Sequence, residues 1–592
     1  MNRILEHILP SVQKPARYAG GEYHSVVKAR PAVTTRFVLC YPDLYEIGMS
    51  NQELRILYDI LNRQKGVWCE RCFAPWVDME AEMRREGLLL FGLESSDPIS
   101  EFDIIDFVLG YEMTDTNLLN MLDLAGLPLR AAERKELAPL VIAGGTACYN
   151  PEPLAPFVDC FLPGESEEVT LELLALYQRA KEEGWSKAEL LEDAAQIPGV
   201  YVPSRYEIQY ASDGQVAAIV PEAGTPERVP RRVVARLPEQ PEEPLVPSME
   251  IVRDHVILEL SRGCAHGCRF CQAGYGSRPV RTRSAEEALR RGAELCRRSG
   301  YQSVSLSALS LFDHPELEAV CRSLTDYCAP RNIALSLRQL RAEPGAVRLA
   351  QQLQRGRKGS LTFSLEAGTQ SLRDAIHKEL TEEAILSACR TAFEAGWTSL
   401  KLCFMLGLPT ETDADVLGIA ELVKRIYPME RGLRAEAHGA PRLAVSVAWF
   451  VPGAQTAFQW EAQCSKEEYL RRVHLLGENL PQTPAVTYHW NSPEVGYLRA
   501  VLSRGDRRLG DVLERAWELG ARLDSWSECF QPQRWQDAFA FCGLDGDFYV
   551  RRSRDRSELL PWSMLQTGVS QETLWQEAQA CHTQSGGGVS HG

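Results

Sequence analysis

The chain has 592 residues, with a hydrophobic content of 45%, a charged content of 24% and a formal net charge of −16. These values are typical of a globular protein too long for a single core, so we expect about two to four domains. No apolar run reaches the roughly 20 residues that span a bilayer, and the acidic charge argues against broad nucleic-acid binding. The N-terminus lacks the apolar region and cleavage site of a signal peptide, so we expect a cytoplasmic protein.

Residues 1–195 are predicted to form a doubly wound, Rossmann-like α/β domain. Continuous apolar runs that alternate with helical stretches are typical of a parallel sheet with helices on both faces. Ligands of such sheets bind at the carboxyl ends of the strands. The expected strands are 36–42, 87–93, 103–112, 139–145 and 158–164, and the clearest helices are 51–64 and 165–184.

A small hairpin and a linker are expected over residues 196–250. The Asp-Gly pair at 213–214 lies between two short runs and predicts the turn of a β-hairpin. The stretch 238–247, PEQPEEPLVP, is rich in proline and glutamate and is typical of a linker.

Residues 251–460 are predicted to form a partial (β/α)6 TIM-like barrel. In such barrels the loops that follow the strands form the active-site face. The remaining residues, 461–592, are expected to be a mostly helical C-terminal region with a disordered tail. The expected barrel strands lie near 255–261, 301–307, 332–338, 359–366, 398–406 and 442–450, and the helices near 284–299, 314–328, 344–356, 369–396 and 411–427.

Three cysteines follow the first barrel strand, in the stretch SRGCAHGCRFCQAG (261–274). Cys264, Cys268 and Cys271 have the spacing C-x3-C-x2-C, and no fourth cysteine accompanies them. A structural zinc site needs four ligands, and His266 lies too close in sequence to its neighbouring cysteines to complete a tetrahedral cage. Three thiolates on a [4Fe–4S] cluster would instead leave one iron open for a small chelating ligand.

This pattern, with the aromatic Phe270 directly before the last cysteine, resembles the signature of the radical SAM superfamily. The resemblance implies that Cys264, Cys268 and Cys271 are the catalytic metal ligands of a [4Fe–4S] cluster whose open iron binds S-adenosylmethionine (SAM). It also implies reductive cleavage of SAM to methionine and a 5′-deoxyadenosyl radical, with an electron from flavodoxin or ferredoxin.

Segments after the later barrel strands resemble the SAM-binding parts of that superfamily. FSLEAGTQSLRD (363–374) resembles its fourth-strand segment, and KLCFMLGLPTETDADV (401–416) resembles the fifth-strand motif that packs on the adenine. The second strand should end in small polar residues near the methionyl group of SAM; here it has no Gly-Gly-Glu sequence and ends in serines. Arg341, at the exit of the third strand, is the candidate for binding a carboxylate. For each residue, an ordinary role in a turn, core or ion pair stays open. The residues assigned to SAM are Phe270, Ser305, Ser307, Ser310, Arg341, Glu366, Gly407, Leu408 and Pro409.

The loop DLYEIG (43–48) resembles the D-x-H-x-x-G loop of the cobalamin-binding domains that precede the barrel in many radical SAM enzymes. Asp43, Tyr45 and Gly48 fall on that spacing, and Gly144 and Gly145 resemble the later glycines that border the nucleotide tail. Tyr45 replaces the histidine that would ligate cobalt, so the resemblance implies cobalamin held without a protein imidazole. Two alternatives stay open, namely a domain that no longer binds cobalamin and one that binds a substrate.

Nearly the whole chain resembles an uncharacterised bacterial family that joins a B12-binding domain to a radical SAM domain, through stretches 17–28, 73–80, 261–274 and 450–460. The implied function is a radical SAM enzyme, with cobalamin-dependent methylation as the reaction to test. One alternative is a methylthiotransferase-like enzyme that modifies tRNA or a ribosomal protein. Another is a non-catalytic Fe–S protein for electron transfer or redox sensing. The substrate stays open, and the basic patch 278–283 leaves a local RNA groove possible despite the acidic net charge.

Overall fold

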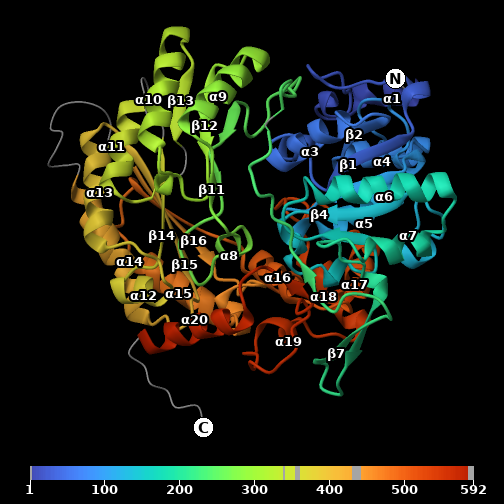
Figure 1. The fold of residues 1–592 in the computed structure, drawn as a ribbon. Helices are drawn as coiled ribbons and strands as arrows, with labels where there is room; N and C mark the ends of the chain where they lie inside the picture. Colours follow the sequence, from blue (N-terminus) through green and yellow to red (C-terminus); the bar gives the residue numbers. More distant parts are fainter. Residues whose placement is uncertain (1–2, 240, 338–340, 354–359, 430–441, 585–592) are drawn as a thin grey trace. The chain divides into compact units, whose positions relative to one another are not determined.

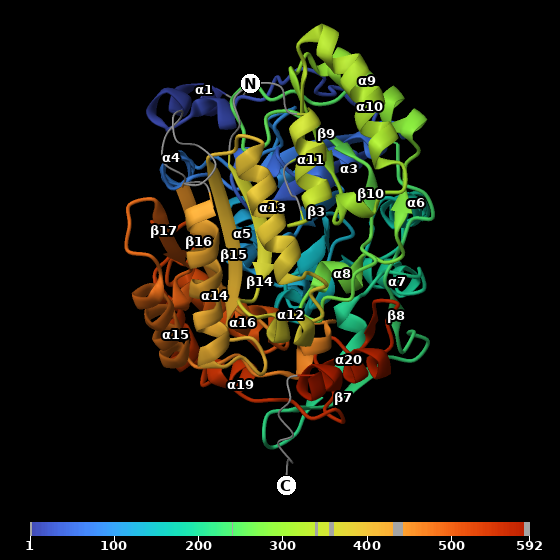
Figure 2. The same ribbon diagram turned by 90° about the vertical axis from the view of Figure 1, so that its left-hand side faces the viewer.

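The computed structural model describes residues 3–239, 241–337, 341–353, 360–429 and 442–584. The chain forms two compact units, each built from separate segments, and Figures 1 and 2 draw their elements. No described helix is both long and apolar enough to cross a membrane. Unit 1 comprises residues 1–254, 502–546 and 557–568, and unit 2 comprises residues 255–501, 547–556 and 569–592.

The core of unit 1 is a parallel sheet with the strand order β2-β1-β3-β4-β5 (Figure 1). This is the order of flavodoxin-like doubly wound sheets, whose switch point lies between β1 and β3. The fold class predicted for this part of the chain is therefore confirmed. The strands are β1 Thr35–Tyr41, β2 Val67–Phe73, β3 Ile104–Val108, β4 Leu140–Gly144 and β5 Cys160–Leu162.

Helices cover both faces of this sheet. The Nδ2 of Asn120 on α5 lies 3.0 Å from the Oε2 of Glu80 on α4, so these two helices share one face. The Oγ of Ser166, which precedes α6, lies 3.1 Å from the Oε1 of Glu53 on α3, so α3 and α6 share the other. The helices of unit 1 are α1 Arg3–Ile8, α2 Tyr45–Gly48, α3 Gln52–Asn62, α4 Val77–Glu86, α5 Asp115–Leu124, α6 Val169–Glu183, α7 Lys187–Ala194, α17 Leu509–Glu518 and α18 Pro532–Cys542.

One predicted strand of this sheet was wrong. Residues 87–93, all of which the structure describes, form no strand, and Phe91 makes only an isolated bridge with Pro98. The second strand is instead β2, whose sequence VWCERCF contains the charged pair Glu70 and Arg71. This pair interrupts the apolar run that predicts a buried strand, yet both side chains are fully buried in ion pairs.

Unit 1 contains the predicted hairpin and one further small β pair that was not predicted. The hairpin joins β6 Tyr206–Tyr210 to β7 Val216–Pro221 in antiparallel register, and Gly214 has φ +86° in its turn. A second small pair joins β8 Val229–Pro230 to β18 Leu565–Gln566. The described residues of the stretch 238–247 contain no helix or strand, as expected of a linker, and residue 240 lies outside the description.

The segment 502–546 packs on the loops at the carboxyl ends of the unit 1 strands. The Oδ1 of Asn117, after β3, accepts a hydrogen bond from the backbone N–H of Leu523 at 2.6 Å. The Nδ2 of Asn150, after β4, donates to the carbonyl oxygen of Gly505 at 2.9 Å. The local helical pattern of this segment gave no sign of these long-range contacts.

Asp524 in this segment should make the stability of unit 1 depend on pH. Its Oδ2 accepts a hydrogen bond from the Oγ1 of Thr116 at 3.1 Å. Burial raises the pKa of Asp524 from 3.8 to about 6, so the folded state keeps this proton where the unfolded state has lost it. The free energy of unfolding should therefore fall as pH rises from about 4 to 6. Asp524→Asn should remove this loss and gain about 2 kcal/mol over wild type across that range.

Urea unfolding at pH 4, 5, 6 and 7 checks this pH dependence. Asp193→Asn is the control, because Asp193 lies in an ion pair with Arg179 in which both side chains are half-exposed. Parallel pH profiles for wild type and Asp524→Asn would contradict the prediction.

Unit 2 carries the strands of the partial barrel (Figure 2). Seven of its described strands form two parallel groups, β13-β12-β9 and β14-β15-β16-β17, and β10 and β11 form a separate antiparallel pair. Helices α13 and α14 lie outside β14–β16. All six predicted strands are present, which confirms the TIM-like class of this part. The strands are β9 Val256–Glu259, β10 Ser261–Arg262, β11 Arg281–Thr282, β12 Ser303–Ser307, β13 Ala334–Leu337, β14 Leu361–Glu366, β15 Ser399–Leu406, β16 Arg442–Trp449 and β17 Val486–Trp490.

The helices of unit 2 also follow the predicted alternation. Strand β17 was not predicted and pairs in parallel with β16 inside a region expected to be mostly helical. The end of the predicted helix 344–356 and most of the predicted disordered tail (585–592) lie outside the described residues. The helices are α8 Gln272–Gly276, α9 Ala285–Ser299, α10 Leu317–Cys328, α11 Pro344–Leu353, α12 Gln370–Ala375, α13 Glu382–Glu394, α14 Asp413–Ile426, α15 Lys466–Asn479 and α20 Gln571–Gln584, while α16 Pro493–Arg504 and α19 Gly546–Val550 belong in part to each unit.

Candidate functional site

The three predicted cysteine ligands lie in one loop that follows β9 and β10 in unit 2. Antiparallel pairing of β10 with β11 holds the two ends of this loop together. Gly263 has φ +89°, and a Cβ at this position would lie 2.5 Å from the carbonyl oxygen of Pro279. Only glycine permits this backbone approach, so Gly263, which the sequence analysis did not single out, shapes the cysteine loop.

Cys264, Cys268 and Cys271 are free thiols, and each is partly exposed. The Sγ of Cys271 accepts a hydrogen bond from the backbone N–H of Gly274 at 3.3 Å, in the first turn of α8. Burial raises the pKa of Cys268 to about 11, the charge of Lys378 lowers it, and the neighbouring thiols raise it further. The neighbouring thiols therefore oppose the ionisation of Cys268, and a cationic iron centre would favour the thiolate forms. Among the residues that the structure describes, no three histidine, cysteine or carboxylate side chains are already placed as a metal site. This donor set fits a [4Fe–4S] cluster with one open iron.

Phe270 and Leu408, both assigned to SAM, meet in one apolar cluster beside the cysteine loop. Phe270 packs at the margin of this cluster, and Leu408 comes from the turn after β15. Ala367, directly after β14, and Phe450, directly after β16, belong to its core. Leu408, Ala367 and Phe450 are at most 3% exposed, so within this cluster Phe270 is the assigned residue that keeps partly exposed apolar surface.

Glu366 lies at the last position of β14, where the register with β15 shifts after Ser364. Its φ is +70°, a conformation that side chains with a Cβ rarely adopt and that clusters at functional sites. The Nζ of Lys378 lies 3.5 Å from its Oε1. Burial raises the pKa of Glu366, and the charge of Lys378 lowers it.

Lys378 is a site residue that the sequence analysis missed. Its charge acts on Glu366 and also lowers the pKa values of Cys268 and Cys271. The residue follows α12 and is far from the cysteines in sequence, so no local motif indicates that it lies near them in the fold. Lys378 is therefore a cation near both a carboxylate and two candidate cluster ligands, and the charge of Arg341 also lowers the pKa of Cys268.

Arg341 reaches the cysteine loop through His266. Its Nη1 lies 2.5 Å from the Nε2 of His266, and its Nη2 donates to the carbonyl oxygen of Glu379 at 2.6 Å. The Nδ1 of His266 lies 2.7 Å from the Oε2 of Glu379. Arg341 thus ties the segment after β13 to the loop, and its guanidinium is already engaged by these groups.

The candidate serines lie at the end of β12. Ser305 is buried within the strand, and Ser307 is its last, partly exposed residue. The Oγ of Ser310 is buried and has no hydrogen-bond partner among the residues that the structure describes. Ser310 is therefore the serine with unused bonding capacity at this strand end.

Gly407 and Pro409 flank Leu408 in the turn after β15. Gly407 has φ +86°, and a Cβ there would lie 2.7 Å from the Sγ of Cys464. Its N–H donates to the Oε2 of Glu411 at 2.7 Å. Burial raises the pKa of Glu411 to about 7, while the neighbouring arginine lowers it. The glycine is thus needed for the packing of the turn itself.

The C-terminal helix α20 holds the cysteine loop from outside the barrel. Arg269, next to Cys268 in the loop, is buried, and its Nε lies 3.0 Å from the Oε2 of Glu577 on α20. Its Nη1 donates to the carbonyl oxygen of Ala375 at 2.5 Å and to the Oε1 of Gln584 at 2.8 Å. The sequence analysis gave α20 no role.

Tyr45 and Asp43, assigned to cobalamin, lie in unit 1 after β1. The ring of Tyr45 is 1% exposed, and its hydroxyl donates to the Oε1 of Glu22 at 3.0 Å. The carboxylate of Asp43 accepts hydrogen bonds from the Nε1 of Trp526 at 2.8 Å and the Oγ of Ser525 at 3.2 Å. Both side chains are engaged within unit 1.

Two of the three glycines of this pattern are required by packing inside unit 1, and the third has room for a side chain. A Cβ on Gly48 would lie 2.3 Å from the ring of Phe73, and a Cβ on Gly145, at φ +106°, would lie 2.3 Å from the carbonyl oxygen of Leu109. A Cβ on Gly144 would make only ordinary contacts, of 3.9 Å. Because Tyr45 and Asp43 are held by hydrogen bonds inside unit 1, neither of them fits the role of a protein ligand to the cobalt of a cobalamin.

Two family models match the chain. Residues 53–203 match the model described as radical SAM proteins, N-terminal, and residues 258–423 match the model of the radical SAM superfamily. An uncharacterised protein of Methanocaldococcus jannaschii is 24% identical over 479 residues, which cover 80% of this chain and 90% of that protein.

Two solved structures resemble the chain in part. One is the radical S-adenosylmethionine methyltransferase TsrM from Kitasatospora setae with cobalamin and a [4Fe-4S] cluster bound, with a TM-score of 0.46, 14% identity and coverage of 70% of this chain and 75% of that one. The other is the cobalamin-dependent S-adenosylmethionine radical enzyme OxsB, with a TM-score of 0.44, 13% identity and coverage of 93% and 79%.

Proposed function

The chain belongs to the radical SAM superfamily, as the cysteine pattern predicted, and from this premise we propose how its residues act. It is an enzyme whose cofactors are a [4Fe–4S] cluster and SAM. We propose that Cys264, Cys268 and Cys271 hold the cluster. The observation that carries this proposal is the loop after β9, where three free thiols lie near a half-buried Glu–Lys pair whose lysine lowers the pKa of Cys268.

The residues around the loop have the charges that SAM requires. The methionyl end of SAM carries an ammonium and a carboxylate, and we propose that Glu366 binds the first and Lys378 the second. The partly exposed Phe270, packed on the cluster that contains Leu408, supplies the apolar surface for the adenine. Once bound, the cluster supplies the electron that cleaves SAM to methionine and a 5′-deoxyadenosyl radical. Arg269 and Arg341 fix the loop by their bonds to neighbouring segments.

Anaerobic reconstitution with iron and sulfide tests this function. The reduced protein should show the EPR signal of a [4Fe–4S]+ cluster, SAM should change that signal, and 5′-deoxyadenosine and methionine should form together. We expect a flavodoxin or ferredoxin to replace dithionite as the electron donor. A cluster signal that SAM leaves unchanged would instead favour a non-catalytic Fe–S protein. Signals from two clusters would favour the methylthiotransferase alternative.

Replacing Lys378 with methionine should weaken SAM binding about 10–100-fold, because a charge-assisted contact to the carboxylate is lost. The cluster should still assemble, because all three cysteines remain. Equilibrium dialysis with radiolabelled SAM measures the affinity, and the iron content measures the cluster. Lys424→Met is the matched control, since Lys424 pairs only with Glu421 on the surface of α14. Equal affinity in both variants would refute the role of Lys378.

Methyl transfer through cobalamin is the finer reaction that we propose to test. Tyr45 cannot offer an imidazole, and its hydroxyl is used by Glu22. Any Co(II) that the protein retains after incubation with hydroxocobalamin should therefore be base-off, with no nitrogen superhyperfine splitting in its EPR spectrum. Nitrogen splitting would contradict this prediction and require a histidine from elsewhere in the chain.

A further inference from the structure

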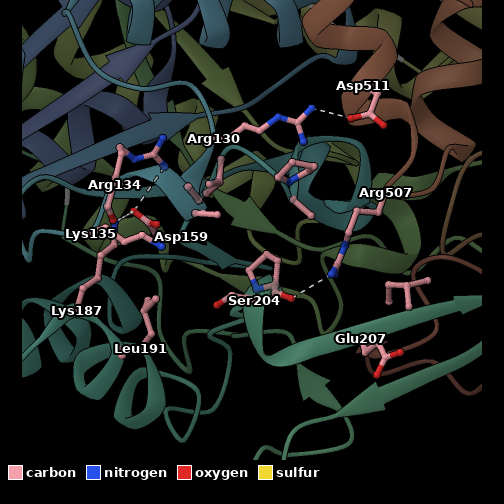
Figure 3. A pocket seen from close by; sticks show the side chains of 18 of the residues that line it. Arg130, Arg134, Lys135, Asp159, Lys187, Leu191, Ser204, Glu207, Arg507 and Asp511 are labelled. Carbon is pink, nitrogen blue, oxygen red and sulfur yellow. Dashed lines mark hydrogen bonds and ion pairs between the residues drawn. The ribbon is translucent and has the colours of Figure 1, made fainter. Parts of the chain in front are cut away.

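Unit 1 contains a cavity that the proposed reaction does not use. Its volume is about 790 Å³, within the range of small-molecule pockets (Figure 3). The segments before β4 and β5, the start of α7, the hairpin β6–β7 and the start of α17 line it. The cavity lies entirely within this unit.

One wall of this cavity carries more positive than negative charge. Figure 3 shows Arg134, Lys135 and Lys187 gathered around Asp159. The Nζ of Lys187 lies 2.9 Å and the Nη2 of Arg134 lies 3.7 Å from the Oδ2 of Asp159. Lys135 is exposed at the same wall. Three cations thus face a single carboxylate, and that carboxylate also accepts a hydrogen bond from the backbone N–H of Val141.

The two inner cations are buried with one carboxylate between them. Their N–H groups also donate to backbone carbonyls, those of Arg134 to Pro128, Leu129 and Phe157 and that of Lys187 to Arg134, so their hydrogen bonds are largely satisfied while one positive charge stays unmatched. The side chains of Arg134 and Lys187 are 3% and 7% exposed. The Nε of Arg134 has no hydrogen-bond partner among the residues that the structure describes. Burial lowers the pKa of both groups, and the charge of Asp159 only partly opposes this. A buried charge in excess of its partners is costly, and a bound anion would remove that cost.

The remaining lining of the cavity includes both arginines paired with carboxylates and apolar residues. On the opposite side in Figure 3, Arg130 pairs with Asp511 at 2.6 Å, and Arg507 pairs with Glu152 at 3.0 Å, so these cations are matched. The lining also includes apolar residues, and Figure 3 shows Leu191 near Lys187. The cavity therefore offers one unmatched cationic wall and an apolar body.

We propose that this cavity is a binding site for a small organic anion. The negative group lies against Lys187, Arg134 and Lys135, and an apolar part of the ligand lies along the wall that includes Leu191. The site is independent of the cysteine loop, so its ligand is not the SAM of the proposed reaction.

The probe is 8-anilinonaphthalene-1-sulfonate, an apolar molecule with one negative group, in equilibrium dialysis against the reconstituted full-length protein. N-phenyl-1-naphthylamine, which lacks the sulfonate, is the neutral comparison. We expect one saturable site for the anion. Lys187→Met should weaken the anion about 10-fold or more and change the neutral probe by less than about 2-fold, because the variant leaves Arg134 and Asp159 as a neutral pair.

Two further variants keep the proposal falsifiable. Lys181→Met is the matched control, because Lys181 also pairs with an aspartate of unit 1, Asp103 at 2.5 Å, but lies outside the cavity. Lys135→Glu changes an exposed position and should weaken the anion even if Lys187→Met fails to fold. The proposal is overturned if the anion shows no saturable binding, if both probes lose affinity equally, or if Lys181→Met matches the cavity variants.

Discussion

Replacing Cys268 with alanine should abolish the reductive cleavage of SAM, with a loss of about 1,000-fold or more in the rate of 5′-deoxyadenosine formation. Cys268 is the middle member of the three-thiol set, and its pKa responds to both other cysteines and to Lys378. Loss of one thiolate leaves two ligands for a cluster that normally takes at least three from the protein. Iron content and 5′-deoxyadenosine, measured on the same anaerobic preparation, separate cluster loss from loss of SAM binding.

Cys403→Ala is the matched control for this experiment. Cys403 is a free, partly exposed cysteine on β15 of the same unit, so its thiol is as accessible to oxidation as those of the loop cysteines. Its replacement should leave iron content and SAM cleavage near wild type. A Cys268→Ala protein that still forms 5′-deoxyadenosine at the wild-type rate would refute the assignment of the loop.

The sequence predicted most of the fold because its strands stand out between helical stretches. Four of the five unit 1 strands are nearly continuous apolar runs, and all six barrel strands were found as well, although strands such as β15 and β16 alternate buried with partly exposed residues. Strand β2 was missed because Glu70 and Arg71 interrupt its apolar run, and 87–93 was chosen because it is apolar. In β2, long-range ion pairs replace apolar burial, and a local pattern carries no information on such partners.

In the candidate site, too, the features set by local sequence could be predicted, and those set by long-range contacts could not. The cysteine spacing is a local pattern, and the loop could be predicted from it. Lys378, Gly263 and the anchor between Arg269 and Glu577 depend on segments that meet only in the folded chain. Gly145 adds a constraint of the same kind, because its backbone approaches that of Leu109, a contact that the sequence does not indicate, while its assignment to cobalamin stays a prediction.

Replacing Arg71 with methionine should lower the free energy of unfolding of unit 1 by about 3–5 kcal/mol. Its guanidinium, 0% exposed, lies 2.8 Å from Glu22 and 2.8 Å from Glu94, whose side chains are each 1% exposed. Without the cation, two buried carboxylates face each other unpaired. Urea unfolding followed by circular dichroism measures the loss, and Arg85→Met, at a 60% exposed arginine, should change stability by less than about 0.5 kcal/mol. A loss below about 1 kcal/mol for Arg71→Met would mean that water reaches these carboxylates. Water at Glu22 could then replace the hydrogen bond that Tyr45 donates to this carboxylate, and the Tyr45 hydroxyl would be free to contact a ligand in the loop after β1.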